Sequence, residues 1–275
     1  MLVLFAVATL GLSGFAAWFF FGGPEDDPTR VKLTVEMAEI EALKPQARSG
    51  DMKVQYVLAR LYHTSQFGSR DLDLAYEWYS KAAEQGHPGA QYFIGTFFAD
   101  AKVVKQSYYR ASEWYRLAAN LGRVADAQLA LGDLYFHGRG VPHDYAEALG
   151  WYKKAAEQGH PVAQYLLGSM YQEGWAGDYD PVEVYKWFTL AHRQRDRVLT
   201  DNPKFDTRAA LDGVGKGMNQ DQIKRAEDAA RAVPGSLRPR PMRRVRARSD
   251  GCNGRTGSAR RAGRSGHRPR YNFHP

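Results

Sequence analysis

Cysteine is almost absent from this chain of 275 residues, since Cys252 is its only one. A disulfide or a zinc site built on thiolates needs at least two cysteines, so the chain can form neither within itself. Lysine is missing from the last 40 residues, which hold 12 arginines and one aspartate. The formal net charge of +8 therefore comes from this tail, and the residues before it are slightly acidic. The high pI indicates no basic surface on the folded part.

Long apolar runs are also scarce, and residues 1–23 form the one long stretch without a charged side chain. At about 1.5 Å per residue, its run of about 20 apolar residues can cross the roughly 30 Å hydrocarbon core of a bilayer. A cleaved signal peptide is the alternative, but such a peptide has a shorter apolar core and a basic start. We therefore predict a transmembrane anchor over 1–23 and a linker over 24–33.

One phrase occurs twice, as WYSKAAEQGHP at 78–88 and as WYKKAAEQGHP at 151–161. A looser copy, WYRLAANLG, starts at Trp114, and a shorter one, WFTLAH, starts at Trp187. The four tryptophans are 36, 37 and 36 residues apart. A period of this length indicates tandem structural repeats rather than one catalytic core.

Each repeat is predicted to hold two helices. In the first, helix A, apolar residues at i, i+4 and i+8 form one stripe, as Val54, Leu58 and Tyr62 do. The second, helix B, follows a residue that can accept hydrogen bonds from the free amides of a helix start: Asp71, Ser107, Asp144 and Asp180. Glycine readily adopts the left-handed conformation that closes a helix, so we expect helix B to end at Gly86, Gly122 and Gly159.

Two further columns recur in helix A. One is always glutamine: Gln55, Gln91, Gln128 and Gln164. The other is small: Ala59, Gly95, Gly132 and Gly168. Glycine inside a helix costs about 1 kcal/mol relative to alanine, so its recurrence needs a reason. We expect helix B of the same repeat to approach helix A closely at this column.

A single repeat cannot fold alone, because ordering its residues costs more than its few apolar side chains return. Each helix pair must bury its outer face on the next, so the predicted fold is all-α, an α/α solenoid of helix-turn-helix repeats with an N-terminal transmembrane helix. The predicted segments are an anchor (1–23), a linker (24–33), a capping helix (34–50), four repeats (51–86, 87–122, 123–159 and 160–195), closing helices (196–233) and a disordered tail (234–275). Pro45 is a possible break in the capping helix, and Asn219 is expected to cap the last of the closing helices.

The pattern AQYxLGxxY, a loop GxGV and then DxxxAxxWYxKAAEQG resembles the Sel-one-like repeat family, a relative of the tetratricopeptide solenoids. The third repeat is the best match, through Ala127–Tyr135, the loop Gly138–Val141 and Asp144–Gly159, whereas the other repeats lack the full loop. The resemblance covers residues 50–195, and residues 206–233 are similar to the closing helices of bacterial members. It implies a right-handed superhelix, a membrane-anchored protein and an adaptor that binds proteins or peptides.

The sequence offers few groups of residues that could form a catalytic or metal site. His87 and His160 occupy equivalent turns and are interpreted as part of the repeat pattern. His137 and His143 flank the loop of the third repeat, but no third metal ligand is indicated. The segment 213–217 lacks the spacing and the hydroxyl of a phosphate loop. Members of the family discussed as β-lactamases have paired cysteines, which are absent here. We therefore predict no enzyme activity, and no catalytic, cofactor-binding or metal-binding residue.

The candidate binding surface lies on helix A, at positions that vary among the repeats and belong to neither the apolar stripe nor the glycine column. Solenoids commonly bind partners through such a face, although an ordinary solvated face is the alternative. The residues predicted to bind a protein or peptide partner are Val57, Arg60, Thr64, Phe93, Thr96, Asp100, Asp133, His137, Leu166, Ser169 and Glu173. Ala130 lies in the same columns.

The arginine-rich tail after Pro234 cannot bury a core, so we predict that it is disordered. Clustered arginines neutralise phosphates, which makes binding of nucleic acid or an anionic surface the second functional hypothesis. Twelve arginines without a lysine are also typical of a frameshifted reading of GC-rich sequence. A cell-envelope hydrolase is the third hypothesis, and it lacks an identifiable nucleophile.

The favoured hypothesis is a non-enzymatic, membrane-tethered scaffold that binds a protein or peptide and needs no cofactor. Two indications of the side of the membrane on which the repeats lie conflict with each other. Arg30, Lys32 and Lys44 follow the apolar run and none precede it, which favours a cytoplasmic C-terminal side. The precedent of the resembled family favours the periplasmic side of the bacterial membrane, and we expect the repeats there.

Overall fold

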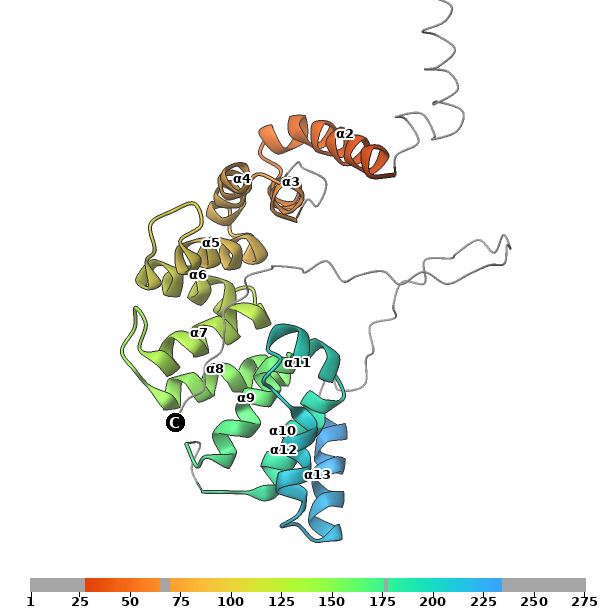
Figure 1. Ribbon diagram of the computed structural model, residues 1–275. Helices are drawn as coiled ribbons and strands as arrows, with labels where there is room; N and C mark the ends of the chain where they lie inside the picture. The colour runs from red at the N-terminus through yellow and green to blue at the C-terminus, as the bar shows by residue number, and fades with distance from the viewer. Residues whose placement is uncertain (1–27, 65–69, 176–177, 234–275) are drawn as a thin grey trace, which may run out of the picture. The chain divides into compact units, whose positions relative to one another are not determined.

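The computed structural model describes residues 28–64, 70–175 and 178–233, and within these ranges it contains 12 helices and no strand (Figure 1). The all-α repeat fold predicted from the sequence is confirmed. The predicted anchor over 1–23 and the tail over 234–275 lie outside the described residues. Among the helices that are described, none is long and apolar enough to cross a membrane. The chain divides into two compact units between His143 and Asp144, inside the third predicted repeat.

The first unit consists of helices that pack consecutively, each on the next (Figure 1). They are α2 (Pro28–Arg48), α3 (Met52–Thr64), α4 (Leu72–Glu84), α5 (Pro88–Asp100), α6 (Tyr108–Asn120) and α7 (Ala125–His137). The pairs α3/α4 and α5/α6 are helices A and B of the first two repeats, and α7 is helix A of the third.

Helix α2 differs from the prediction at its start and at Pro45. It begins at Pro28, inside the segment 24–33 predicted as a linker, and it continues through Pro45 to Arg48. A proline inside a helix removes one N–H donor and usually breaks the helix. Here tertiary packing opposes the break, because Ile40 and Ala47 on either side of Pro45 are buried in a helix that packs on α3.

The second unit contains the remaining helices, which are α8 (Tyr145–Glu157), α9 (Pro161–Gln172), α10 (Pro181–His192), α11 (Arg195–Asp201), α12 (Thr207–Gly215) and α13 (Gln220–Ala232). Helix α9 packs on α8 and α10, which continues the repeat pattern. The last three helices then fold back, so that α12 and α13 pack on α10 while α11 packs on α9. Val184 and Phe188 of α10 form a buried cluster with Val214 of α12.

The predicted helix starts are confirmed by their hydrogen bonds. The side chain of each N-cap residue accepts from a backbone amide in the first turn of α4, α6, α8 or α10, and these residues are Asp71, Ser107, Asp144 and Asp180. Asn219 caps α13, and the side chain of Gln222 returns to the Asn219 backbone amide, which completes a capping box. The sequence therefore located the start of each of these helices.

Helix B ends as predicted at all three glycines, because α4, α6 and α8 each end two residues before Gly86, Gly122 and Gly159. Gly86 and Gly159 have the expected positive φ angles, 93° and 84°. At Gly122 the conformation differs, because the left-handed residue of that turn is Arg123, with φ of 50°. Trp114 and Trp151 are 37 residues apart, one more than the other neighbouring tryptophans of the repeats, and the extra residue lies in this turn. The insertion moves the left-handed position by one. Gly122 instead lies so close to Pro88 that a Cβ atom would be 2.1 Å from the Pro88 Cβ.

The glycines inside helix A have the predicted cause. A Cβ on Gly95 of α5 would lie 2.5 Å from the ring of Tyr115 in α6, and a Cβ on Gly168 of α9 would lie 2.8 Å from the ring of Phe188 in α10. Both rings belong to helix B of the same repeat and are buried. Each glycine therefore permits the close packing of its helix pair.

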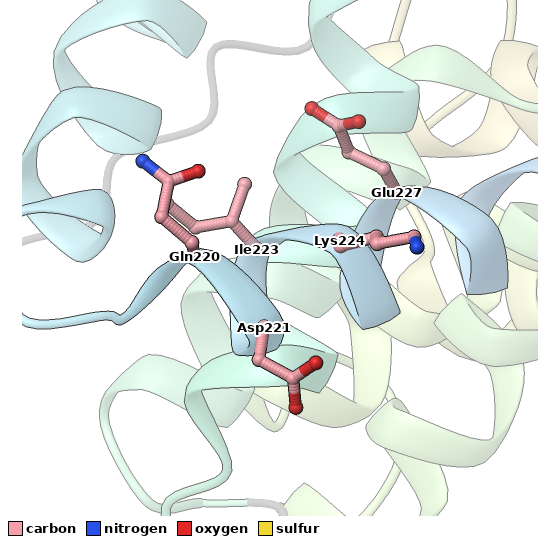
Figure 2. Close-up of a pocket in the computed structure, with 5 residues that line it drawn as sticks. All are labelled: Gln220, Asp221, Ile223, Lys224 and Glu227. Atoms are coloured by element: carbon pink, nitrogen blue, oxygen red, sulfur yellow. The ribbon is translucent and has the colours of Figure 1, made fainter.

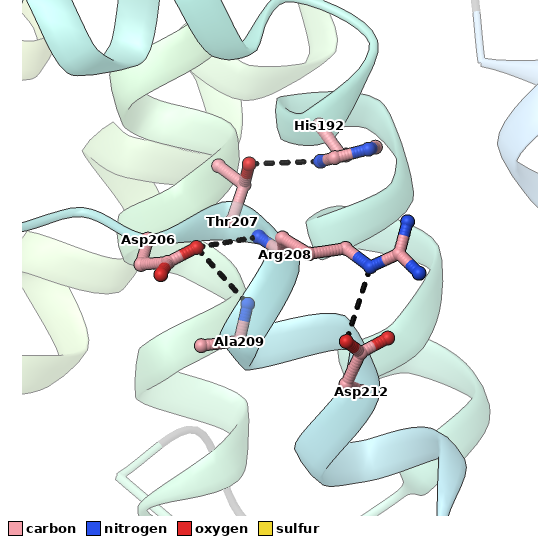
Figure 3. A network of polar contacts seen from close by, with 6 residues as sticks. All are labelled: His192, Asp206, Thr207, Arg208, Ala209 and Asp212. Atoms are coloured by element: carbon pink, nitrogen blue, oxygen red, sulfur yellow. Dashed lines mark hydrogen bonds and ion pairs between the residues drawn. The ribbon is translucent and has the colours of Figure 1, made fainter.

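A polar contact fixes α12 on α10 in the second unit (Figure 3). The Nδ1 atom of His192, at the end of α10, lies 2.9 Å from the hydroxyl of Thr207, which is buried. Asp206 accepts from the amides of Arg208 and Ala209 and so caps α12. These bonds hold the closing helices against the last repeat and have no catalytic arrangement.

Candidate protein-binding surface

The glutamine column ties each helix A to the helix before it. The buried side-chain amides donate to carbonyl groups in the last turn of α2, α4, α6 and α8, and these donor and acceptor pairs are Gln55 with Ala47, Gln91 with Ala83, Gln128 with Ala119 and Gln164 with Ala156, at 3.0 to 3.3 Å. Each buried glutamine amide thereby gains an acceptor. The oxygens of Ala47, Ala83 and Ala156 also accept from a glycine amide in the turn that follows the helix. Helix α2 thus takes the place of a helix B ahead of the first repeat.

The repeated histidines cap the helix that follows them. The Nδ1 atom of His87 accepts from the Ala90 amide at 3.2 Å, and that of His160 accepts from the Ala163 amide at 3.3 Å. The sequence placed both residues in a turn of the repeat, and the structure adds that they are the N-caps of α5 and α9. A histidine must be neutral at the accepting nitrogen to do this.

The first predicted surface residues are on α3, where Val57, Arg60 and Thr64 are all exposed. The Thr64 hydroxyl donates to the backbone carbonyl of Arg60 at 2.8 Å. The guanidinium of Arg60 lies 5.9 Å from the centre of the Tyr56 ring, within the range of a cation–π interaction. Val57 is 42% exposed and is one of the few large apolar side chains on the surface. Helix α3 therefore offers an apolar and cationic face to a partner.

The next predicted residues, on α5, are divided between packing and surface. Phe93 is half-buried, and its ring stacks on that of Tyr79 in α4 with 4.7 Å between centres. The Thr96 hydroxyl donates to the Phe93 carbonyl at 2.7 Å, so it is satisfied within its own helix. Asp100 is exposed and forms an ion pair with Lys102 at 2.9 Å. Of the three predicted residues on α5, only Asp100 is exposed, and its carboxylate is paired with Lys102.

The remaining predicted residues lie on α7 and α9. Asp133 and His137 of α7 are half-buried, and His137 Nδ1 lies 2.9 Å from the Asp133 carbonyl oxygen. Glu173, just after α9, is exposed, and Ser169 is half-buried and donates to the Tyr165 carbonyl. The other predicted residue of α9 is placed differently.

Leu166 does not lie on a surface. Its side chain is 0% exposed, so a partner cannot contact it, and its prediction as a surface residue is wrong. The physical reason is the return of the chain after α10. Helix α11 packs on α9, and the ring of Phe205 stacks on that of Tyr165 with 4.4 Å between centres. The helix A position that is exposed at Val57 on α3 is therefore core at Leu166 on α9.

Sequence reasoning overlooked an aromatic cluster beside the α3 face. His63 of α3 lies between the rings of Tyr79, Phe93 and Phe97, at 5.2 to 5.8 Å between centres. Burial lowers the pKa of His63, and the positive charges of Lys102 and Arg70 lower it further. Tyr56 stacks on His87 at 4.0 Å, and burial also lowers the pKa of His87. The only sequence signal was the density of aromatic residues in the first two repeats.

A hollow elsewhere on the molecule is not a convincing ligand site. It lies along α13 and is lined by Gln220, Asp221, Ile223, Lys224 and Glu227 (Figure 2). All five residues come from one exposed helix, so no second element supplies converging polar groups. Among residues that the structure describes, no three His, Cys, Asp or Glu side chains are close enough together to hold a metal ion.

The chain is similar to regulatory proteins over its repeats. It is 36% identical to chitin synthase regulatory factor 1 of Schizosaccharomyces pombe over 139 residues, which are 49% of this chain and 30% of that protein. It is 31% identical to an exopolysaccharide production negative regulator of Rhizobium leguminosarum bv. viciae over 132 residues, 43% of this chain and 49% of that protein. The matched region thus spans 30% and 49% of the length of these two relatives.

A solved structure and a family model agree on the class of repeat. The crystal structure of c5321, a protective antigen present in uropathogenic Escherichia coli strains that displays an SLR fold, matches with a TM-score of 0.61 and 27% identity, over 88% of this chain and 49% of that one. A model of the Sel1 repeat matches residues 53–87, 88–122, 125–160 and 161–196, just over half of the chain, and leaves out Arg123 and Val124 of the inserted turn. The chain therefore belongs to the Sel1 repeat family.

Proposed function

We propose that this chain is a non-enzymatic regulatory adaptor that binds a protein or peptide through the helix A face of α3 and α5. The observation that carries the proposal is the open face of α3. Val57, Arg60 and Thr64 are exposed there, and none of the three is needed to pack α3 on α4. The position equivalent to Val57 on α9 is the buried Leu166. In the column of Val57, the exposed position is therefore on α3 and not on α9.

The chemistry of this face suggests the kind of partner. Val57 supplies exposed apolar area, Arg60 supplies a cation beside it, and Asp100 of α5 adds a carboxylate. A peptide with an apolar side chain next to an acidic group would complement α3. Membership of the Sel1 repeat family and the two relatives named as regulators support an adaptor rather than a catalyst.

We further propose that residues 1–23 tether the adaptor to a membrane and that the repeats lie on its periplasmic side. The support for this part is the uncharged apolar run of the sequence. A reporter that is active only outside the cytoplasm, fused after Val233, should be active. A cytoplasmic reporter fused at the same position should then be silent, and the reverse pattern would place the repeats in the cytoplasm.

The binding face can be tested by site-specific crosslinking in cells. A photo-crosslinking amino acid replaces Val57 in the full chain, and a matched control chain carries it at Glu84, which is exposed on α4. We expect a crosslinked partner from position 57 and none from position 84. Val57→Ser with Arg60→Glu should abolish capture of the same partner and leave thermal unfolding unchanged. Equal crosslinking from both positions would remove the α3 face from consideration.

A further inference from the structure

Helix B of the second repeat, α6, carries an apolar stripe that helix B of the neighbouring repeats lacks. The stripe consists of Trp114, Leu117 and Leu121, at i, i+3 and i+7, which places all three on one side of the helix. The equivalent positions hold Trp78, Lys81 and Gln85 in the first repeat and Trp151, Lys154 and Gln158 in the third. Leu117 is 40% and Leu121 is 77% exposed.

The polar residues that the leucines replace have structural roles. The Lys81 ammonium lies 4.3 Å from the centre of the Trp78 ring, and that of Lys154 lies 3.6 Å from the centre of the Trp151 ring. Each lysine thereby places its ammonium over the ring of its tryptophan, as in a cation–π interaction. Leu117 offers no cation to Trp114, and Trp114 is more exposed than either of these tryptophans.

Leu121 also cannot make the hydrogen bond that Gln85 makes at the equivalent position of the first repeat. In the first repeat, the Gln85 amide donates to the buried Oε1 atom of Gln55 at 2.7 Å. In the second repeat, the equivalent Oε1 atom of Gln91 is buried and has no hydrogen-bond partner among the described residues. A buried carbonyl without a partner destabilises the fold. Leu121 thus leaves an acceptor unsatisfied and exposes apolar area to water.

The last repeat shows what covers a leucine at this position. Helix α10 carries Leu190 three residues after Trp187, as α6 carries Leu117 three residues after Trp114. Leu190 is only 2% exposed, and α10 is the helix on which α12 and α13 pack. Leu190 of α10 therefore shows that a leucine at this position of helix B can be buried in this chain.

The charges around the stripe indicate what would cover α6. Arg110 and Arg116 on α6 and Arg123 just after it are exposed, and Glu113 is the one carboxylate of α6. Helix α4 has the opposite balance, with three carboxylates and one lysine. We propose that the stripe on α6 docks an amphipathic helix of another protein, whose apolar ridge is flanked by acidic side chains. This surface is separate from the α3 face of the proposed function.

The test uses the full chain and a designed fluorescent peptide of about 18 residues, roughly five helical turns, with leucines at i, i+3 and i+7 flanked by glutamates. A second peptide has lysine in place of every glutamate. Fluorescence anisotropy should show binding of the glutamate peptide, and hydrogen exchange should locate new protection in α6. Leu117→Lys with Leu121→Gln installs the residues of the first and third repeats and should weaken binding at least about tenfold.

Two features keep the test decisive. Leu121→Gln supplies the missing partner of Gln91, so the variant should be at least as stable as the wild type, and lost binding cannot come from unfolding. The variant Val57→Ser with Arg60→Glu on α3 should bind the glutamate peptide normally. Equal binding of the lysine peptide, binding that survives the α6 substitutions, or self-association of the chain through the stripe would each overturn the proposal.

Discussion

Helices α3 and α9 occupy the same place in the first and fourth repeats, yet their outer faces differ in burial. On α3 the face that includes Val57 and Arg60 is exposed, and on α9 the position equivalent to Val57 is the buried Leu166. The helices themselves are alike, since both carry the glutamine that bonds the preceding helix. What differs is the following chain, because α11 packs on α9. A repeat position therefore has no fixed burial, and neighbouring elements decide whether it is core or binding surface.

The largest expected effect is a direct test of this difference. Leu166→Ala should lower the free energy of unfolding by about 2–5 kcal/mol, because it leaves a cavity in a fully buried site. Val57→Ala, at the equivalent exposed position, should change it by less than about 0.5 kcal/mol. Urea denaturation of the two full-length variants measures both values. Similar losses in the two variants would mean that the faces do not differ as described.

The small residue inside helix A also differs between α3, which has Ala59, and α9, which has Gly168. Gly168→Ala should cost about 1–3 kcal/mol, since its new Cβ would lie 2.8 Å from the buried ring of Phe188. Ala59→Gly on α3 should cost about 1 kcal/mol for a different reason, the lower helix propensity of glycine. Thermal unfolding of both variants checks the order. A neutral Gly168→Ala variant would show that the helix pair can move apart without loss.

A stabilising change is expected in the second repeat. Leu121→Gln should raise the free energy of unfolding by about 0.5–1.5 kcal/mol, because the new amide can donate to the unpaired Gln91 oxygen, as Gln85 donates to Gln55. Val57→Gln, which also replaces an exposed apolar residue, is the matched control and should change little. If both variants gained equally, the gain would come from surface polarity and not from the hydrogen bond.

The smallest expected effect concerns pH. Helix α3 carries His63 where α9 carries Gln172, and burial lowers the pKa of His63 below its usual value of about 6.5. The folded state therefore binds a proton less readily than the unfolded state does. Stability from this residue is complete above about pH 6.5 and declines as the pH falls below that value. His63→Gln should flatten the decline between about pH 7.5 and 5.5 in denaturant unfolding, and an unchanged slope would contradict the assignment.

Much of the fold could be predicted because it depends on local chemistry. The N-caps at Asp71 and Ser107 and the capping box at Asn219 involve atoms within three residues of each other, so sequence spacing determines them. The glycine column could be interpreted because the glycine recurs, and the second and fourth repeats show the same close packing, at Gly95 and Gly168. The turn at Gly122 differs in conformation for an equally local reason, since it carries one extra residue and its left-handed position is Arg123.

The candidate surface was harder to predict because exposure is a property of the whole assembly of helices. Variation among the repeats correctly identified the exposed face of α3, but variation alone could not distinguish a free surface from one covered by another part of the chain. Phe93 varies among the repeats and is nevertheless stacked on Tyr79. Leu166 varies too, and it lies in the core of the second unit.

The sequence by itself determined the repeat period, the helix starts and the close approach of α5 to α6 and of α9 to α10, because these depend on residues within one repeat. The tertiary structure alone decided which repeated positions are open to a partner. It showed that α11 packs on α9, that the column of Lys81 and Lys154 becomes the exposed Leu117 on α6, and that Gln91 has an unpaired oxygen. The physical reason is that burial and hydrogen bonding depend on atoms far apart in the chain, which sequence spacing does not specify.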